Sequence, residues 1–405
     1  MNETALGRAG GPFTAALLVA AAIPLHLALA LGTDLSPDEA YYLCAARRGG
    51  AIPDLVDHPP LLPWLLRLGD HLGGSIELRV RLWAILFSAA TGLAVVALAR
   101  RFGARREGAL VAAWVGSWAL LPTAGGFVTT PDGAALFAVA VALLAIGRPR
   151  GLPIAAVALF VGALAKVVVL PIALVLALAE LGAAGSSRRD GIARAAALLT
   201  GPTLALPLLG PSLRFQLHHA FTQTATSGWS PTLALGAVVA AISAQALLWS
   251  PPVLWIGARA LPRVPRGPHA VALCLSGLVL VSALLRGVPP EPNWWAPAAL
   301  IVVAAAAVGA DALTRRARNA LVLAVMVPTL VAAAHTVWPF LPLTEATDPT
   351  ARLHGWSRGV EPLRAPGLGV YGPAAERCIY RNDCNEIEKY FNDLMLIHEA
   401  RSRPF

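Results

Sequence analysis

The chain has 405 residues, of which 57% are hydrophobic and 14% charged, and its mean hydropathy is +0.64. Soluble domains carry about 25% charged residues, so this composition excludes a water-soluble globule and indicates a membrane protein. The formal charge of +9 comes mostly from arginines in short clusters between apolar runs. That pattern is typical of cytoplasmic membrane loops and not of a nucleic-acid-binding surface.

The first apolar run, about Phe13 to Leu31, follows Arg8 and is long for a signal peptide. It predicts an uncleaved signal anchor with a cytoplasmic N-terminus. Five arginine clusters follow: Arg100, Arg101, Arg105 and Arg106; Arg148 and Arg150; Arg188, Arg189 and Arg194; Arg259, Arg263 and Arg266; and Arg315, Arg316 and Arg318. If every cluster is cytoplasmic, each stretch between clusters crosses the membrane out and back. The pattern predicts an all-α polytopic bundle of about 11 transmembrane helices.

The stretch from Gly151 to Gly185 is short enough for one helix to cross by itself. A single crossing would place one arginine cluster outside, so we expect two short helices that turn near Lys166. This gives a membrane domain over residues 1–340, a first external loop over 33–78, and a short external tail over 341–405. The tail predicts one helix around Glu386 to Glu399, and its Cys378 and Cys384 could form a disulfide or remain two thiols.

The first external loop contains Ser36-Pro37-Asp38-Glu39, which has the pattern of a helix start. Ser36 can cap the helix, Pro37 suits its first position, and Glu39 stands where a capping box needs an acid. Asp38 would be a first-turn carboxylate favoured by the helix dipole, which is either its only role or an addition to a catalytic one.

Three further external segments carry polar residues. Thr129-Thr130-Pro131-Asp132 repeats the pattern of a cap, a proline and a carboxylate. Residues 214–219 offer Arg214 and His219, and residues 286–295 offer Arg286, Glu291 and Asn293. Lys166 is a lone ammonium within an apolar run, where it either faces a polar cavity or extends to the interface. Trp294 and Trp295 are more typical of an aromatic belt than of sugar stacking.

Several motifs, in order along the chain, resemble those of a known family. They are Ser36-Pro-Asp-Glu-Ala-Tyr-Tyr, Asp57-His-Pro-Pro-Leu, Thr130-Pro-Asp, Gly162-Ala-Leu-Ala-Lys166, Glu291-Pro-Asn-Trp-Trp and Ala351-Arg-Leu-His-Gly-Trp356. Together they are similar to the protein O-mannosyltransferases and lipid A aminoarabinose transferases, which are glycosyltransferase families 39 and 83 with the GT-C fold. The resemblance implies an inverting hexosyl or pentosyl transferase that moves a sugar from a polyprenyl-phosphate donor to a hydroxyl acceptor.

The same resemblance implies which residues form the site. Asp38 matches the acidic residue of the family's first loop, the expected general base, and Glu39 is the second catalytic candidate. From these motifs and from the polar residues of the external segments, which alone supply His219 and Arg286, the expected substrate-binding residues are Tyr42, Asp57, His58, Asp132, Lys166, His219, Arg286, Glu291 and Asn293. Lys166 would stabilise the negative charge that develops on the leaving phosphate. No metal-ligand spacing is present, so we expect no required metal, although His58 or His219 could join an acid around one.

The resemblance also implies the bacterial inner membrane, with the site facing the periplasm and the donor entering from the lipid. A multi-pass solute or lipid transporter is the main alternative, because a bundle with an intramembrane lysine also suits a carrier. A carrier predicts internal symmetry between halves, and we find no convincing repeat. A non-catalytic scaffold would leave Asp38, Asp132 and Lys166 without a role.

Overall fold

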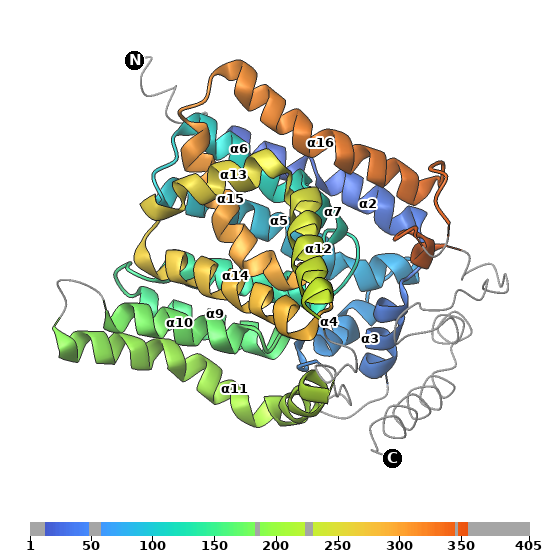
Figure 1. Cartoon of the computed structure of the whole chain (residues 1–405). Helices are drawn as coiled ribbons and strands as arrows, with labels where there is room; N and C mark the ends of the chain where they lie inside the picture. Colours follow the sequence, from blue (N-terminus) through green and yellow to red (C-terminus); the bar gives the residue numbers. More distant parts are fainter. Residues whose placement is uncertain (1–12, 48–57, 183–186, 223–229, 345–346, 355–405) are drawn as a thin grey trace.

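The computed structural model describes residues 13–47, 58–182, 187–222, 230–344 and 347–354, with the backbone alone for 215–222. Within these ranges every regular element is a helix (Figure 1). The helices are α2 (Ile23–Gly32), α3 (Pro37–Arg47), α4 (Leu61–Asp70), α5 (Ile76–Arg101), α6 (Arg106–Trp118), α7 (Leu120–Ala124), α8 (Pro131–Ala145), α9 (Gly151–Ala165), α10 (Val169–Leu181), α11 (Arg188–Thr222), α12 (Pro231–Trp249), α13 (Pro251–Ala260), α14 (Arg266–Arg286), α15 (Ala296–Ala310) and α16 (Arg315–Val337), with short 3-10 helices η1 (Leu261–Arg263), η2 (Pro292–Trp295) and η3 (Ala351–Leu353).

Seven helical stretches are long and apolar enough to cross a bilayer. They are Phe13–Gly32, Ile76–Arg101, Arg188–Arg214, Pro231–Trp249, Arg266–Arg286, Pro292–Ala310 and Arg315–Val337. Three shorter apolar helices, α8, α9 and α10, lie among them. The chain is therefore an all-α, multi-pass integral membrane protein, as its composition predicts. The number of about 11 crossings and the sides of the termini remain predictions.

The predicted break near Lys166 is confirmed. Helix α9 ends at Ala165, Lys166 has extended backbone angles, and α10 begins at Val169. The short helices pack closely because small residues line their contacts. A Cβ atom on Gly201 of α11 would lie 1.9 Å from the carbonyl oxygen of Ala156 on α9, so only glycine permits this approach.

The arginine clusters gather at one end of the bundle. The Asp311 carboxylate accepts hydrogen bonds from the backbone N–H groups of Arg105 and Gly108, which joins the end of α15 to the start of α6. Arg101, at the last turn of α5, donates to the carbonyl oxygens of Leu143 and Leu144 at the end of α8. Neighbouring loops therefore cap this end with positive charge and backbone hydrogen bonds.

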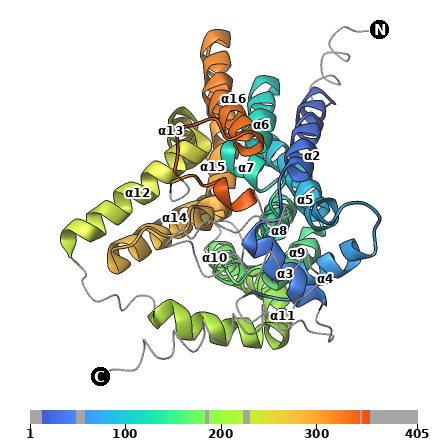
Figure 2. The same ribbon diagram turned by 90° about the vertical axis from the view of Figure 1, so that its right-hand side faces the viewer.

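The acidic loops gather at the opposite end, beside α3 and α4 (Figures 1 and 2). Helices α3 and α4 pack on the start of α5 through a separate small core that includes Leu43, Leu66 and Val80. Residues 341–344 and 347–354 of the predicted tail are described, and the second stretch also packs here, because Leu353 joins a cluster with Leu29 and Phe127. The predicted helix 386–399, Cys378 and Cys384 lie outside the described residues.

Candidate active site

The first external loop is held by a buried ion pair between Glu39 and Arg81. Both side chains have 0% exposure, and the guanidinium donates Nε to Oε1 at 3.0 Å and Nη2 to Oε2 at 2.9 Å. The predicted capping box is present, since the Ser36 N–H donates to Glu39 Oε2 at 2.9 Å and the Glu39 N–H donates to Ser36 Oγ at 3.3 Å. Arg81 also donates to the carbonyl oxygens of Ala30 and Thr33, so it joins the end of α2 to the start of α3.

Asp38 lies in the first turn of α3, directly beside this buried pair, and remains 28% exposed. Its Oδ2 atom is 3.3 Å from Nη2 of Arg352, which comes from the segment after the last long helix. Burial raises the pKa of Asp38, the charge of Arg352 opposes that rise, and the negative charges of Glu291 and Glu39 add to it, so the pKa ends above its usual range. Such an environment suits a carboxylate that takes up a proton during a reaction.

A second polar cluster centres on Asp132 in the first turn of α8. The Lys166 ammonium lies 2.6 Å from Asp132 Oδ1, and the Asn293 amide Nδ2 donates to Asp132 Oδ2 at 3.0 Å. The three residues come from the start of α8, the turn between α9 and α10, and η2. The lysine and aspartate side chains are 16% and 17% exposed. The lone ammonium predicted from sequence therefore has a partner, at the end of the bundle where α3 and α4 lie, as the cost of an isolated charge requires.

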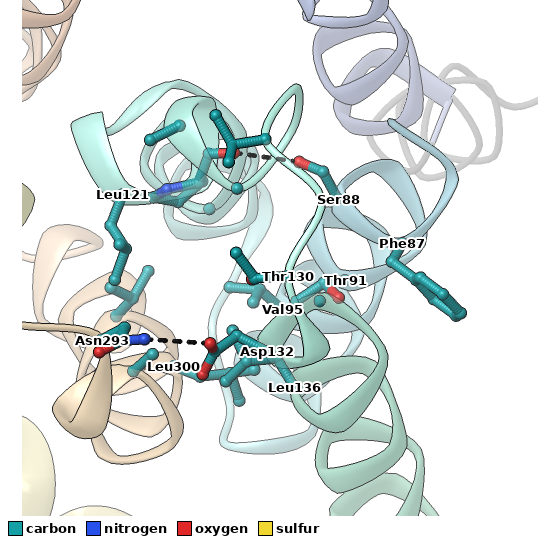
Figure 3. A pocket seen from close by; sticks show the side chains of 18 of the residues that line it. Phe87, Ser88, Thr91, Val95, Leu121, Thr130, Asp132, Leu136, Asn293 and Leu300 are labelled. Carbon is teal, nitrogen blue, oxygen red and sulfur yellow. Dashed lines mark hydrogen bonds between the residues drawn. The ribbon is translucent and has the colours of Figure 1, made fainter. Parts of the chain in front are cut away.

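A cavity of about 250 Å³ opens beside this cluster (Figure 3). Asp132, Asn293 and Thr130 form its polar end, and the Asn293 amide faces the Asp132 carboxylate there. The rest of the lining is mainly apolar and comes from α5, α6, α7, α8, α12 and α15, with Val95, Leu136, Trp249, Leu300 and Val303 among its residues. The buried Oδ1 atom of Asn293 has no hydrogen-bond partner within the described structure. The cavity thus suits a largely apolar ligand with a polar head.

Two interactions, one hydrogen bond and one electrostatic effect, connect the Asp38 cluster with the Asp132 cluster. Glu39 Oε1 accepts a hydrogen bond of 2.9 Å from the backbone N–H of Thr129, three residues before Asp132. Glu291 lies close enough to Asp38 to raise the pKa of that carboxyl, and it stands two residues before Asn293. Asp38 and Asp132 therefore lie at the same end of the bundle, on segments that contact one another.

The other expected site residues have less direct placements. Tyr42 is buried, and its ring lies 5.7 Å from that of His58. The guanidinium of Arg286 lies over the Trp294 ring, 5.8 Å from its centroid. Arg286 is the last residue of α14, where the helix dipole also stabilises a cation. Asp57 and the side chain of His219 lie outside the described residues. Their roles in substrate binding remain predictions.

Metal binding has no support in the described part of the chain, where no group of three or more His, Cys, Asp and Glu side chains could hold an ion. The expectation that no metal is required remains a prediction.

Sequence reasoning missed the contacts that bring distant segments together. Arg352 stands in the quoted motif after the last helix, yet nothing local indicates that it reaches Asp38. Arg81 is an arginine close to the start of an apolar helix, which is also the signal of an ordinary interface anchor. The expected cap at Thr130 is wrong in detail: Thr130 takes the N-cap position but its side chain makes no cap bond, whereas Thr129 donates its hydroxyl to the Val80 carbonyl.

Comparisons with known proteins agree with this architecture. Residues 57–215 match a family model described as dolichyl-phosphate-mannose-protein mannosyltransferase, a range that includes Asp132 and Lys166 and begins after Asp38. No curated protein sequence matches the chain significantly.

Solved structures extend the likeness over most of the chain. The apo structure of ArnT from Cupriavidus metallidurans has a TM-score of 0.57 and 19% identity, over 90% of this chain and 67% of that one. The same protein bound to undecaprenyl phosphate has a TM-score of 0.54 and 21% identity, over 90% and 68%. The oligosaccharyltransferase AglB from Archaeoglobus fulgidus, in complex with an inhibitory peptide and a dolichol-phosphate, has a TM-score of 0.52 and 14% identity, over 80% and 56%.

At these identities the structural likeness establishes the fold, and the family model adds a likeness over residues 57–215, from within the predicted first external loop into α11. The chain has the fold of the GT-C glycosyltransferases, and the resemblance to protein mannosyltransferases and ArnT that its motifs indicate is confirmed.

Proposed function

We propose that the protein is a membrane glycosyltransferase that transfers a sugar from a polyprenyl-phosphate donor to a hydroxyl acceptor at the α3 end of the bundle. The main support is the joint placement of an acid, Asp38, and a cation, Lys166, at one end of a GT-C fold, with an apolar cavity lined by Asp132, the partner of Lys166. Relatives of that fold are bound to undecaprenyl phosphate and dolichol-phosphate. We further propose that this end faces the periplasm of a bacterial inner membrane, because the arginine clusters lie at the other end.

The chemistry follows from the leaving group. The acceptor oxygen forms a bond to the anomeric carbon while the bond from that carbon to the phosphate oxygen breaks, and the electron pair leaves with the polyprenyl phosphate. The acceptor hydroxyl passes its proton to Asp38, whose raised pKa makes it a stronger base than an ordinary aspartate. Attack opposite the phosphate inverts the anomeric centre. No strong general acid is needed, because the phosphate leaves as a stable anion.

Lys166 supplies positive charge where the phosphate becomes more negative. Its pairing with Asp132 fixes the ammonium at the turn between α9 and α10, and Asn293 holds the second oxygen of Asp132 in place. The apolar cavity next to this cluster would receive the first isoprene units of the donor. Asp132 and Asn293 thus orient the lysine in this proposal.

Glu39 has a different role from the one expected beside Asp38. Its carboxylate has 0% exposure, and its oxygens already accept hydrogen bonds from Arg81, Ser36 and Thr129. It has no route to an acceptor hydroxyl in this arrangement. We propose that it positions Asp38 by fixing the first turn of α3.

The proposal is tested by the glycans that the protein makes. Mass spectrometry of envelope glycolipids and glycoproteins from cells with and without the gene should show one sugar missing from one class of acceptor. Asp38→Asn should reproduce that loss at normal abundance in the membrane, and the control Glu77→Gln, another acid at this end, should not. Full modification with Asp38→Asn would refute the assigned base, and no change on deletion would refute the transferase.

The role of Lys166 in donor binding can be tested separately from its contribution to the stability of the fold. Lys166→Met should raise the donor KM more than the acceptor KM, because it removes the cation near the phosphate. The double variant Asp132→Asn/Lys166→Met removes both charges of the pair, so it should recover the stability lost by Lys166→Met and not the donor affinity. Recovery of both would show that Lys166 acts only in folding.

A further inference from the structure

The segment that follows α16 folds back onto the first external loop and carries an arginine to Asp38. The backbone N–H of Asp34 donates to the carbonyl oxygen of Leu353 at 2.9 Å, and Leu353 packs against the end of α2. Arg352 precedes Leu353 and places Nη2 3.3 Å from Asp38 Oδ2, although the two residues are 314 positions apart. In Figure 1 this red-orange segment lies beside the end of α2.

A buried histidine anchors the segment to the end of α16. The Nδ1 atom of His335 accepts hydrogen bonds from the backbone N–H groups of Phe340 and Leu341, at 3.0 and 3.1 Å. Nδ1 therefore carries no proton. The other ring nitrogen, Nε2, lies 3.1 Å from Asp348 Oδ2 and donates its hydrogen to that oxygen. Asp348 in turn accepts from the backbone and hydroxyl of Thr350, two residues before Arg352. These contacts fix the position from which Arg352 reaches the site.

Arg352 is well suited to a second partner. Its side chain is 37% exposed, against 16% for Lys166, whose ammonium lies only 2.6 Å from Asp132. The 3.3 Å distance from Nη2 to Asp38 Oδ2 is longer than the usual 2.7–2.9 Å of a charge-assisted bond, so this contact with Asp38 is a loose one. The planar guanidinium offers five donors in a geometry that matches phosphate.

The position of Arg352 next to Asp38 indicates which second partner the guanidinium would bind. In the proposed reaction Asp38 takes the proton of an acceptor that attacks the anomeric carbon, and the donor's phosphate is bonded to that same carbon. A guanidinium in contact with Asp38 is therefore within a few ångströms of the phosphate. It is also the cation whose removal would leave Asp38 a stronger base, because the charge of Arg352 opposes the rise of the Asp38 pKa.

We propose that Arg352 is a donor-binding residue that exchanges Asp38 for the phosphate of the lipid donor, so that donor binding releases the base. The proposal rests on the proposed function. Before the donor binds, the arginine holds Asp38 in an ion pair. Once the phosphate takes the guanidinium, the carboxylate is available for the acceptor's proton, and Arg352 together with Lys166 stabilises the charge that the phosphate gains when the anomeric bond breaks.

The test compares two lipids that differ only in the phosphate. Undecaprenyl phosphate and undecaprenol are titrated into the purified full-length chain in detergent, and binding is followed by tryptophan fluorescence. Arg352→Gln should weaken undecaprenyl phosphate binding about tenfold or more, as expected for the loss of one charge-assisted contact, and leave undecaprenol binding unchanged. Arg352→Lys should recover part of the affinity, and the control Arg315→Gln, at the other end of α16, should have no effect.

A double-mutant cycle separates exchange from simple attraction. Asp38→Asn removes the competing carboxylate, so it should tighten undecaprenyl phosphate binding in the wild-type background. If Arg352 is the group that is exchanged, this gain should largely disappear in the Arg352→Gln background. An equal gain in both backgrounds would mean that Asp38 merely repels the phosphate, and would overturn the exchange.

The outcomes also distinguish this proposal from the proposed function. If Lys166→Met weakens phosphate binding and Arg352→Gln does not, the donor assignment stands and the role of Arg352 is refuted. If the wild type binds undecaprenyl phosphate no better than undecaprenol, the polyprenyl-phosphate donor is refuted, and the exchange with it. Selective loss with Arg352→Gln, partial recovery with lysine, and a non-additive cycle together support the exchange.

Discussion

The sharpest prediction for the fold concerns the pair Glu39 and Arg81, compared with the pair Arg47 and Asp70 in the same loop. The first pair is fully buried, whereas the side chains of the second are 23% and 24% exposed. Glu39→Gln keeps the shape but leaves the Arg81 charge uncompensated in a dry site, which costs about 3–5 kcal/mol. Arg47→Gln breaks a partly solvated pair that contributes about 0–1 kcal/mol, and Asp70 keeps a 3.0 Å contact with Arg79.

The assay is thermal unfolding of the detergent-solubilised protein, followed by tryptophan fluorescence. Glu39→Gln should lower the midpoint by several degrees, since 1 kcal/mol corresponds to about 2–4 °C in a chain of 150–250 residues and to less in a longer one. Arg47→Gln should lower it by a degree or less. Equal shifts for the two variants would refute the claim that burial of the Glu39 pair makes it the anchor of the loop.

Three further predictions test packing, protonation and orientation. Gly201→Ala should lower the unfolding midpoint because its Cβ would clash with a backbone carbonyl, whereas Gly236→Ala, with nothing within 4 Å, should leave it unchanged or raise it; an equal loss for both would contradict the close helix contact. The kcat/KM for the donor, which reports the donor-free protein, should fall as the pH falls through the raised pKa of Asp38, and Arg352→Gln, which removes a charge that lowers that pKa, should move this limb to higher pH; a limb that stays in place would contradict the ion pair. Alkaline phosphatase fused after Leu343 should be active in intact cells, and an inactive fusion at normal abundance would place this end in the cytoplasm.

The sequence was sufficient for features that depend on local pattern. Hydropathy and arginine clusters predicted the all-helical membrane bundle, because both signals act within one helix and its flanks. The capping box of Ser36 and Glu39 was also predictable, since its two hydrogen bonds join residues only three apart. The break at Lys166 followed from the cost of placing an arginine cluster outside.

Long-range partners could not be predicted from one sequence. Glu39 and Arg81 are 42 positions apart, and nothing near either residue specifies the other. Glu39 therefore stayed a second catalytic candidate beside Asp38 despite its expected capping role, and its complete burial against Arg81 is what argues against a catalytic role. The contact of Arg352 with Asp38 depends on the way residues 347–354 fold back, which is a property of the packed bundle.

A structure of the full chain bound to undecaprenyl phosphate would locate the donor itself. We predict the phosphate at the α3 end, within hydrogen-bond distance of Lys166 and Arg352, with the first isoprene units in the cavity beside Asp132. A phosphate bound among the arginine clusters at the opposite end, or away from both cations, would contradict it.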